Sequence, residues 1–256
     1  MSVSDLTLKM VLIVIVGVFA GSFMDAVAGG GGLITVPTYL LTGIPAHIAL
    51  GTNKFSSSLG TMVSTGRYIS KGYADLRLAI PSAVLAVIGA HFGTRLQLTI
   101  DEKYLQYILI ALLPIVAFVV LRQRELPEVR REMNEAKRMA ITLIASAIIG
   151  MYDGFYGPGT GTFMIIVLCT IGGLDVRTAS GNAKVMNLAS NIGALATSIM
   201  NGKVFFILGI IGTAASLTGH YLGSGFAIKN GSKVVRPMVI IVLILLVIKV
   251  ISGFFS

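Results

Sequence analysis

Residues 11–32 read VLIVIVGVFAGSFMDAVAGGGG. The stretch begins as an apolar run, carries one carboxylate at Asp25, and ends in four consecutive glycines. An apolar run of about 20 residues is long enough to cross a bilayer, and glycine allows the backbone to leave the helical conformation. We therefore expect a membrane helix that breaks at Gly29, with an ionisable group one turn before the break.

The composition of the whole chain agrees with a membrane protein. Its 256 residues are 55% hydrophobic and 12% charged, with a mean hydropathy of +0.87, whereas soluble domains carry about 25% charged residues. The net charge of +9 comes from Lys and Arg in short segments between apolar runs, which is typical of membrane loops and argues against a nucleic-acid groove. The single cysteine, Cys169, excludes an intramolecular disulfide.

Apolar runs recur along the chain and predict its membrane segments. Most are long enough to span a bilayer, but the second and the seventh are too short. Each of these two follows a glycine-rich break, so we expect them to be half-helices of a re-entrant pair. The runs are Leu8–Ala28, Leu33–Ile44, Phe55–Ile69, Leu78–Leu96, Tyr104–Leu121, Met139–Tyr156, Thr162–Leu174, Val185–Met200, Phe205–Phe226 and Val234–Phe254.

Basic residues orient these segments, because cytoplasmic loops are rich in Lys and Arg. The loop 122–138 carries Arg122, Arg124, Arg130, Arg131, Lys137 and Arg138, so we expect it to be cytoplasmic. Counting outward from this loop places the basic stretches around Lys71 and Lys229 on the same side. The turns at Asp101 and Asn201, and both termini, then lie outside.

The two halves of the chain match each other at an offset of 128 to 130 residues. Asp25 corresponds to Asp153, Lys54 to Lys184, and the remaining matches are Gly29 with Gly157, Lys71 with Asn201, and Gly89 with Gly219. A half with one re-entrant pair and three full spans crosses the bilayer an odd number of times, so the second copy is inserted upside down.

The repeat predicts an all-α polytopic membrane protein with two inverted-topology repeats. Each repeat holds a broken, re-entrant helix pair at a glycine-rich break and three transmembrane helices. The first repeat covers residues 1–122, the charged cytoplasmic linker 123–138, and the inverted repeat 139–256. Inverted repeats are typical of secondary transporters, which bind their substrate near the bilayer midplane.

Four ionisable residues stand apart from the loop charges. Asp25 and Asp153 lie within predicted spans, and Lys54 and Lys184 each start a span without a basic cluster around it. Ionisable groups inside a membrane are costly and by default mark function. We assign the lysines to substrate binding and the aspartates to coupling or structure. The alternative is that each aspartate only pairs with a lysine or caps a broken helix end.

The glycine-rich breaks themselves are candidate anion sites. A half-helix that begins at a break directs its positive end there, which favours an anion. The alternative is that the glycines only allow helices to pack closely. The residues assigned to binding at the two breaks are Gly29, Gly30, Gly31, Gly32, Gly157, Gly159, Thr160 and Gly161.

A polar stripe follows each break. Lys184, Asn187 and Asn191 share one helical face, and so do Lys54 and Ser57. Amide and ammonium donors on these faces would suit an oxyanion, although interhelical hydrogen bonding is the alternative. Asn53 and Asn182 lie near the lysines and join the binding set. His91 and His220 are interpreted as packing or interfacial residues, with proton coupling as the alternative, and no metal site is expected.

Three sequence strings resemble a known family. They are FMDAVAGGGGLITVP at 23–37, ALGTNK at 49–54 and YDGFYGPGTG at 152–161, and they resemble the TauE/SafE family of sulfite or organosulfur exporters. The resemblance covers nearly the whole chain. It implies duplicated membrane permeases that export sulfite, sulfoacetate or related anions, with the binding region at the glycine breaks and the polar faces after them.

We therefore expect export of a small sulfur anion, sulfite or an organosulfonate, across the plasma membrane by alternating access. The membrane potential would drive anion exit by about 2.3 kcal/mol per charge per 100 mV, without ATP or a bound cofactor. The partners are the anion and the bilayer, and we expect no enzyme. An anion channel is an open alternative. An intramembrane aspartyl protease fits poorly, since Tyr152 and Asp153 are not accompanied by a Gly-x-Gly-Asp string. Proton coupling and the oligomeric state stay open.

Overall fold

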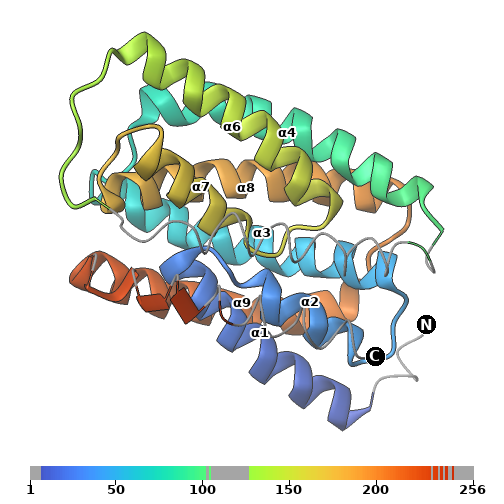
Figure 1. Cartoon of the computed structure of the whole chain (residues 1–256). Helices are drawn as coiled ribbons and strands as arrows, with labels where there is room; N and C mark the ends of the chain where they lie inside the picture. Colours follow the sequence, from blue (N-terminus) through green and yellow to red (C-terminus); the bar gives the residue numbers. More distant parts are fainter. Residues whose placement is uncertain are drawn as a thin grey trace.

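The computed structural model describes residues 7–101, 104 and 127–231, together with 233–235, 237, 238, 240, 241 and 244. Over residues 7–101 and 127–230 the regular elements are helices (Figure 1). Their bounds are α1 Leu8–Ala28, α2 Gly32–Leu40, α3 Ala46–Ser70, α4 Leu76–Thr99, α6 Glu135–Phe155, α7 Thr160–Thr170, α8 Val176–Met200 and α9 Phe206–Asn230.

Four of these helices, α1, α4, α6 and α9, are long and apolar enough to cross a membrane. Their outward faces carry large exposed apolar side chains, among them Ile80 and Val84 on α4 and Ile144 and Ile148 on α6. In water such faces would be costly, whereas lipid solvates them. The chain is therefore a multi-pass membrane protein.

The two more polar long helices, α3 and α8, lie at the centre of the molecule. They contact each other, α3 also packs against α9, and α8 also packs against α4. Outside this central pair, α1 packs along α9 and α4 packs along α6, and Figure 1 shows these two pairs on opposite sides of α3 and α8. Each outer pair joins one helix from the first half of the chain to one from the second.

Glycine ends the helix before each short helix. Gly29 stops α1 in the left-handed conformation, φ 79°, and its N–H donates to the Asp25 carbonyl at 2.7 Å. Gly157 and Gly159 have φ 96° and 85° between α6 and α7. An L side chain at these angles is strained, so glycine sets the two breaks that the sequence predicts.

The helix bounds correct the ends of the two short segments, since α2 stops at Leu40 and α7 at Thr170, and the starts of two longer ones. α3 begins at Ala46 and not at Phe55, and α8 begins at Val176 and not at Val185. The residues added to each helix are mostly small or polar, so a search for apolar runs passes over them, yet in the centre of the bundle they pack against other helices. Lys54 and Lys184 consequently lie in the third turn of their helices and not at the start of a span.

The expected linker 123–138 also ends later than the loop does. α6 begins at Glu135, where the Asn134 side chain caps it by accepting from the Ala136 and Lys137 N–H groups at 2.9 and 3.3 Å. Arg138, expected in a solvated loop, is 1% exposed and donates to the Gly172 carbonyl at 3.0 Å. The span Tyr104–Leu121, apart from residue 104, and most of Val234–Phe254 lie outside the described residues.

Candidate functional site

The two glycine breaks touch each other. The Thr162 N–H donates to the Gly29 carbonyl at 3.3 Å, and the Thr162 hydroxyl donates to the Ala28 carbonyl at 2.7 Å. A Cβ on Gly161 would lie 2.6 Å from the Gly29 Cα, closer than real Cβ contacts come. Glycine at both positions therefore allows the starts of α2 and α7 to meet in the middle of the molecule.

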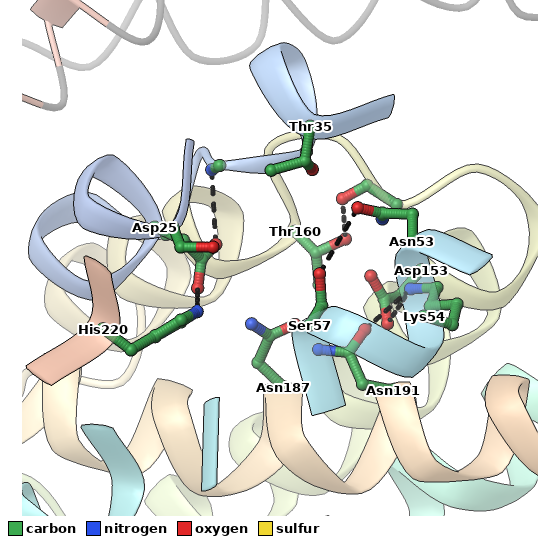
Figure 2. Close-up of a pocket in the computed structure, with 15 residues that line it drawn as sticks. Asp25, Thr35, Asn53, Lys54, Ser57, Asp153, Thr160, Asn187, Asn191 and His220 are labelled. Carbon is green, nitrogen blue, oxygen red and sulfur yellow. Dashed lines mark hydrogen bonds and ion pairs between the residues drawn. The ribbon is translucent and has the colours of Figure 1, made fainter. Parts of the chain in front are cut away.

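A polar cavity lies beside this crossing. Figure 2 shows Thr35 on one side of it, Asn187 and Asn191 on the opposite side, and one acidic group on each flank. The space that water can reach inside is about 20 Å³, roughly what one water molecule requires. The lining residues are Ser22, Asp25, Gly29, Gly31, Gly32, Thr35, Asn53, Lys54, Ser57, Asp153, Gly157, Thr160, Asn187, Asn191 and His220.

One flank of the cavity holds an ion pair between α3 and α6. Lys54 Nζ lies 2.7 Å from Asp153 Oδ2, and the two side chains are 6% and 3% exposed. The ammonium also donates to Asn191 Oδ1 at 2.9 Å, and the carboxylate also accepts the Ser190 hydroxyl at 2.7 Å. Both charges are thus paired and hydrogen-bonded, as buried charges require.

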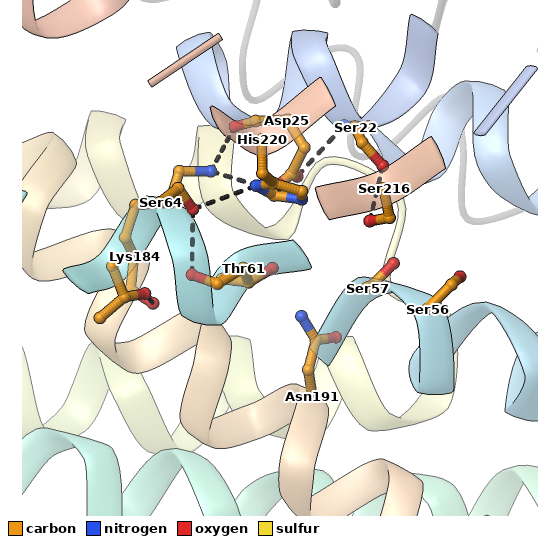
Figure 3. A network of polar contacts seen from close by, with 12 residues as sticks. Ser22, Asp25, Ser56, Ser57, Thr61, Ser64, Lys184, Asn191, Ser216 and His220 are labelled. Carbon is orange, nitrogen blue, oxygen red and sulfur yellow. Dashed lines mark hydrogen bonds and ion pairs between the residues drawn. The ribbon is translucent and has the colours of Figure 1, made fainter. Parts of the chain in front are cut away.

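The other flank holds a second ion pair, between α1 and α8. Lys184 Nζ lies 2.9 Å from Asp25 Oδ2 and also donates to the Asp25 backbone carbonyl. The remaining carboxylate oxygen, Oδ1, accepts the Gly31 N–H at 3.3 Å. His220 Nε2 lies 3.8 Å from Asp25 Oδ2, and its Nδ1 is 3.0 Å from the Ser64 hydroxyl (Figure 3).

Each ion pair joins the two halves of the chain. The aspartate of the first half meets the lysine of the second, and the aspartate of the second half meets the lysine of the first. The pairing that the sequence left as an alternative is therefore present. Two carboxylates and two ammonium groups leave this part of the site without net charge.

Helix N-termini and neutral hydrogen-bond donors also border the cavity. α2 and α7 begin at the breaks, and Gly32 and Thr160 at their first positions line the cavity. The N–H groups of a first helical turn have no partner within the helix and carry partial positive charge. The Thr35 hydroxyl, one turn into α2, is buried without a hydrogen-bond partner in the described part of the chain.

Most residues predicted for the site are brought together. The cavity lining includes both aspartates and Gly29, Gly31, Gly32, Asn53, Lys54, Ser57, Gly157, Thr160, Asn187 and Asn191. Lys184 pairs with Asp25 and does not line the cavity. Gly30, Gly159, Gly161 and Asn182 are also outside the lining, and the Asn182 amide donates to the Thr178 carbonyl of its own helix at 2.8 Å.

Three lining residues were not predicted for the site: Ser22, Thr35 and His220. Ser22 lies one helical turn before Asp25, so a search for polar residues at a spacing of three around each aspartate would have found it. Thr35 follows the glycine break by one turn. His220 carries no such local signal, because its carboxylate partner is distant in sequence. Among the described residues no group of three or more His, Cys, Asp or Glu side chains could hold a metal ion.

Comparison with known proteins identifies relatives along the whole length of the chain. The family model described as sulfite exporter TauE/SafE matches residues 13–250. A probable membrane transporter protein of Sinorhizobium sp, ORF9, is 32% identical over 97% of this chain and 95% of its own. Another, of Haemophilus influenzae, is 33% identical over 91% of both chains. The probable membrane transporter protein YfcA of Escherichia coli K12 is 32% identical over 89% of this chain and 84% of its own. No solved structure matches.

Proposed function

The chain belongs to the sulfite exporter TauE/SafE family, and from this premise we propose that it is a secondary transporter that exports a small sulfur-containing anion, with sulfite as the first candidate. The family and its relatives are membrane transporters. The proposal includes the substrate. It also places the protein in the plasma membrane, with residues 122–138 on the cytoplasmic side. It further assigns Asp25 and Asp153 as coupling or structural groups.

The observation that carries this proposal is the polar cavity shared by the two halves of the chain. Helices of 21, 9, 25 and 24 residues are followed by helices of 21, 11, 25 and 25 residues. This repeated order supports our proposal of two inverted repeats, 1–122 and 139–256. In such transporters the substrate binds where broken helices of the two repeats meet, and one repeat rocks against the other.

We assign anion binding to the starts of α2 and α7 and to the donors around them. The Thr35 and Ser57 hydroxyls, the amides of Asn53, Asn187 and Asn191, and the Lys54 ammonium face one space. A sulfite ion is larger than the water-sized space present, so the helices have to separate for it to enter. Such a tight site fits a carrier that encloses its substrate better than an open channel.

The two aspartates are poorly arranged for peptide hydrolysis. Aspartic proteases place two carboxylates so close that they share one proton. Here each aspartate has a lysine ammonium as its near partner, at 2.7 Å for Asp153 and 2.9 Å for Asp25. This arrangement favours binding or coupling roles for both residues.

Anion efflux from liposomes tests the proposal directly. Purified protein is reconstituted into vesicles loaded with sulfite, sulfate, thiosulfate or sulfoacetate, and release is followed under an imposed membrane potential. We expect saturable release of one sulfur anion, lost when Lys54→Ala and Lys184→Ala are combined. Lys71→Ala is the control, because Lys71 is an exposed lysine at the end of α3. Release of none of these anions would remove the proposed substrate class.

A further inference from the structure

The two ion pairs of the site have different third partners. Asp153 Oδ2 accepts the hydroxyl of Ser190 at 2.7 Å, a group that does not ionise. Asp25 Oδ2 instead lies 3.8 Å from the Nε2 atom of His220, the one side-chain type whose ordinary pKa places its charge change near physiological pH. One flank of the cavity therefore has a titratable third group and the other has a hydroxyl.

This difference involves three matched positions of the two halves. At the offset of 130 residues that relates Lys54 to Lys184, His220 corresponds to Ala90, Ser64 to Ala194, and Ser190 to Gly60. A Cβ on Gly60 would lie 2.4 Å from the His220 ring, so glycine there makes room for the imidazole.

The matching place on the other flank has no imidazole. Ala90 packs its backbone against Gly154, next to Asp153, and Ser190 contacts the carboxylate from α8. The two flanks of the cavity are thus built alike in their ion pairs and differently in this one side chain.

The surroundings of His220 hold two other charged groups. They are Asp25 from α1 and Lys184 from α8, while α3 contributes the Ser64 hydroxyl. Ser22 of α1 and Ser216 of α9 lie close by and bond to each other at 2.9 Å. Figure 3 shows Asp25, Lys184 and Ser64 gathered around the imidazole. Among the described residues His220 thus faces one carboxylate and one ammonium.

A proton can reach this cluster from the cavity. The Asp25 side chain is 14% exposed, whereas Asp153 on the other flank is 3% exposed. Asp25 and His220 both line the cavity. Ser64 contacts Nδ1 on the side of the ring away from Asp25, which leaves Nε2 directed at the carboxylate. A proton taken up from the cavity is then shared between Asp25 and His220.

The charge balance of the site gives this proton a role. With both ion pairs formed the site carries no net charge, so an entering anion meets two carboxylates that repel it. A proton added to the Asp25–His220 pair offsets one negative charge, and it also weakens the hold of Asp25 on Lys184. Anion and proton therefore favour each other's binding, as linkage between two sites requires.

We propose that Asp25, His220 and Lys184 form a proton-binding site, and that each transported anion crosses the membrane together with a proton held there. This inference rests on the proposed transport of an anion. The proton enters from one aqueous phase together with the anion and is released with it on the other side. No bond of the substrate is made or broken.

Proton movement in proteoliposomes tests this site. Vesicles containing a pH-sensitive dye are given an outward sulfite gradient, and internal pH and sulfite release are recorded together. Because sulfite itself binds a proton near neutral pH, the comparison is with His220→Gln at equal sulfite release. We expect a larger rise of internal pH in the unsubstituted protein, and an imposed pH gradient to drive sulfite against its own gradient only there. Sulfite release without this additional pH rise would overturn the proton site and leave the transporter standing. Absence of release for sulfite and the other sulfur anions would overturn both.

Single substitutions test whether the transported proton binds at Asp25, His220 and Lys184. His220→Gln keeps a polar side chain but does not titrate, and we expect it to abolish pH-driven accumulation. Ser64→Ala removes the contact to Nδ1 and should shift the pH profile of transport by about one unit, a tenfold change in proton affinity. The control is His91→Gln, because His91 contacts Thr197 at 2.9 Å and does not line the cavity. Proton movement that persists undiminished in His220→Gln, or an unshifted pH profile in Ser64→Ala, would overturn the assignment.

Discussion

At the level of single residues, the stability of each buried charge depends on its ion-pair partner. Lys54 and Asp153 come from helices that are distant in sequence, and each would be an unpaired buried charge without the other. Removing one member of a buried ion pair costs more than the pair itself contributes, because the remaining charge has lost both water and partner. The stability lost in a single substitution is therefore determined mainly by the partner charge that stays buried and unpaired.

A double-mutant cycle should reveal this coupling. We expect Asp153→Asn and Lys54→Met each to lower the free energy of unfolding by about 3–5 kcal/mol. The double variant should lose clearly less than the sum of the two, since no charge is left unpaired. Thermal unfolding in detergent provides the measurement, with the exposed Lys71→Met as control. Costs that simply add would mean that the two groups are hydrated separately.

The Thr35 hydroxyl is a second test at the residue scale. It is buried at the cavity without a partner in the described structure, so Thr35→Val should leave stability unchanged or raise it. Affinity for the anion should fall by about tenfold or more, because a hydrogen bond to a charged group contributes about 1.5–3 kcal/mol. Binding is measured by calorimetry on the purified protein.

Thr61→Val is the matched control for this substitution. The Thr61 hydroxyl is also buried without a partner in the part of the chain described, but it does not line the cavity. Equal loss of affinity in the two variants would show that Thr35 does not contact the anion.

At the scale of elements, the two glycine breaks position the site because they pack directly against each other in the middle of the molecule. The starts of α2 and α7 approach as closely as they do because Gly29 and Gly161 have no side chains. The polar central helices α3 and α8 then supply the side chains around the crossing. The apolar outer helices separate this polar interior from lipid.

A methyl group at the crossing should disturb this arrangement. Gly161→Ala would place its Cβ 2.6 Å from the Gly29 Cα, and because backbone cannot move aside cheaply we expect a loss of about 1–3 kcal/mol in stability. Gly66→Ala is the control, since a Cβ there meets no atom within 4 Å. Alanine in that exposed helical turn should be neutral or stabilise by up to about 1 kcal/mol. A smaller loss in thermal unfolding for Gly161→Ala than for Gly66→Ala would contradict the close crossing.

At the scale of the whole molecule, the two halves are interleaved. α1 packs on α9 and α4 packs on α6, so most of the packing around the cavity is between halves. Inverted insertion would place matching turns of the two halves on opposite sides of the membrane. Movement of one half against the other could then expose the shared cavity to each side in turn.

Cysteine labelling tests this topology. Lys71 and Asn201 are matched, exposed residues that end α3 and α8. In a Cys169→Ser background, we expect Asn201→Cys to react with a membrane-impermeant thiol reagent added to intact cells. Lys71→Cys should react only after the membrane is permeabilised. Labelling of both positions from the same side would rule out the inverted repeat.

Much of the fold follows from local sequence features. Apolar runs predict α1, α4, α6 and α9 to within a few residues, and the runs of glycine predict the breaks at Gly29 and Gly157. Both features act through neighbouring residues, by lipid solvation of apolar side chains and by backbone freedom. The same reasoning identified Asp25, Asp153 and Lys54 as cavity residues, because ionisable groups are rare in such spans.

The tertiary structure determined which charged side chains pair with each other. Residue types and spacing leave Lys184 free to face either aspartate, and packing of α8 against its neighbours brings it to Asp25, 159 residues away in sequence. The same holds for His220, which reaches Asp25 only because α9 packs along α1. Helix periodicity determines the face on which a side chain lies, but the facing helix is chosen by the packing of the whole bundle. The sequence alone therefore determined a membrane protein with two charged glycine breaks, and the packed structure determined how their charges are paired.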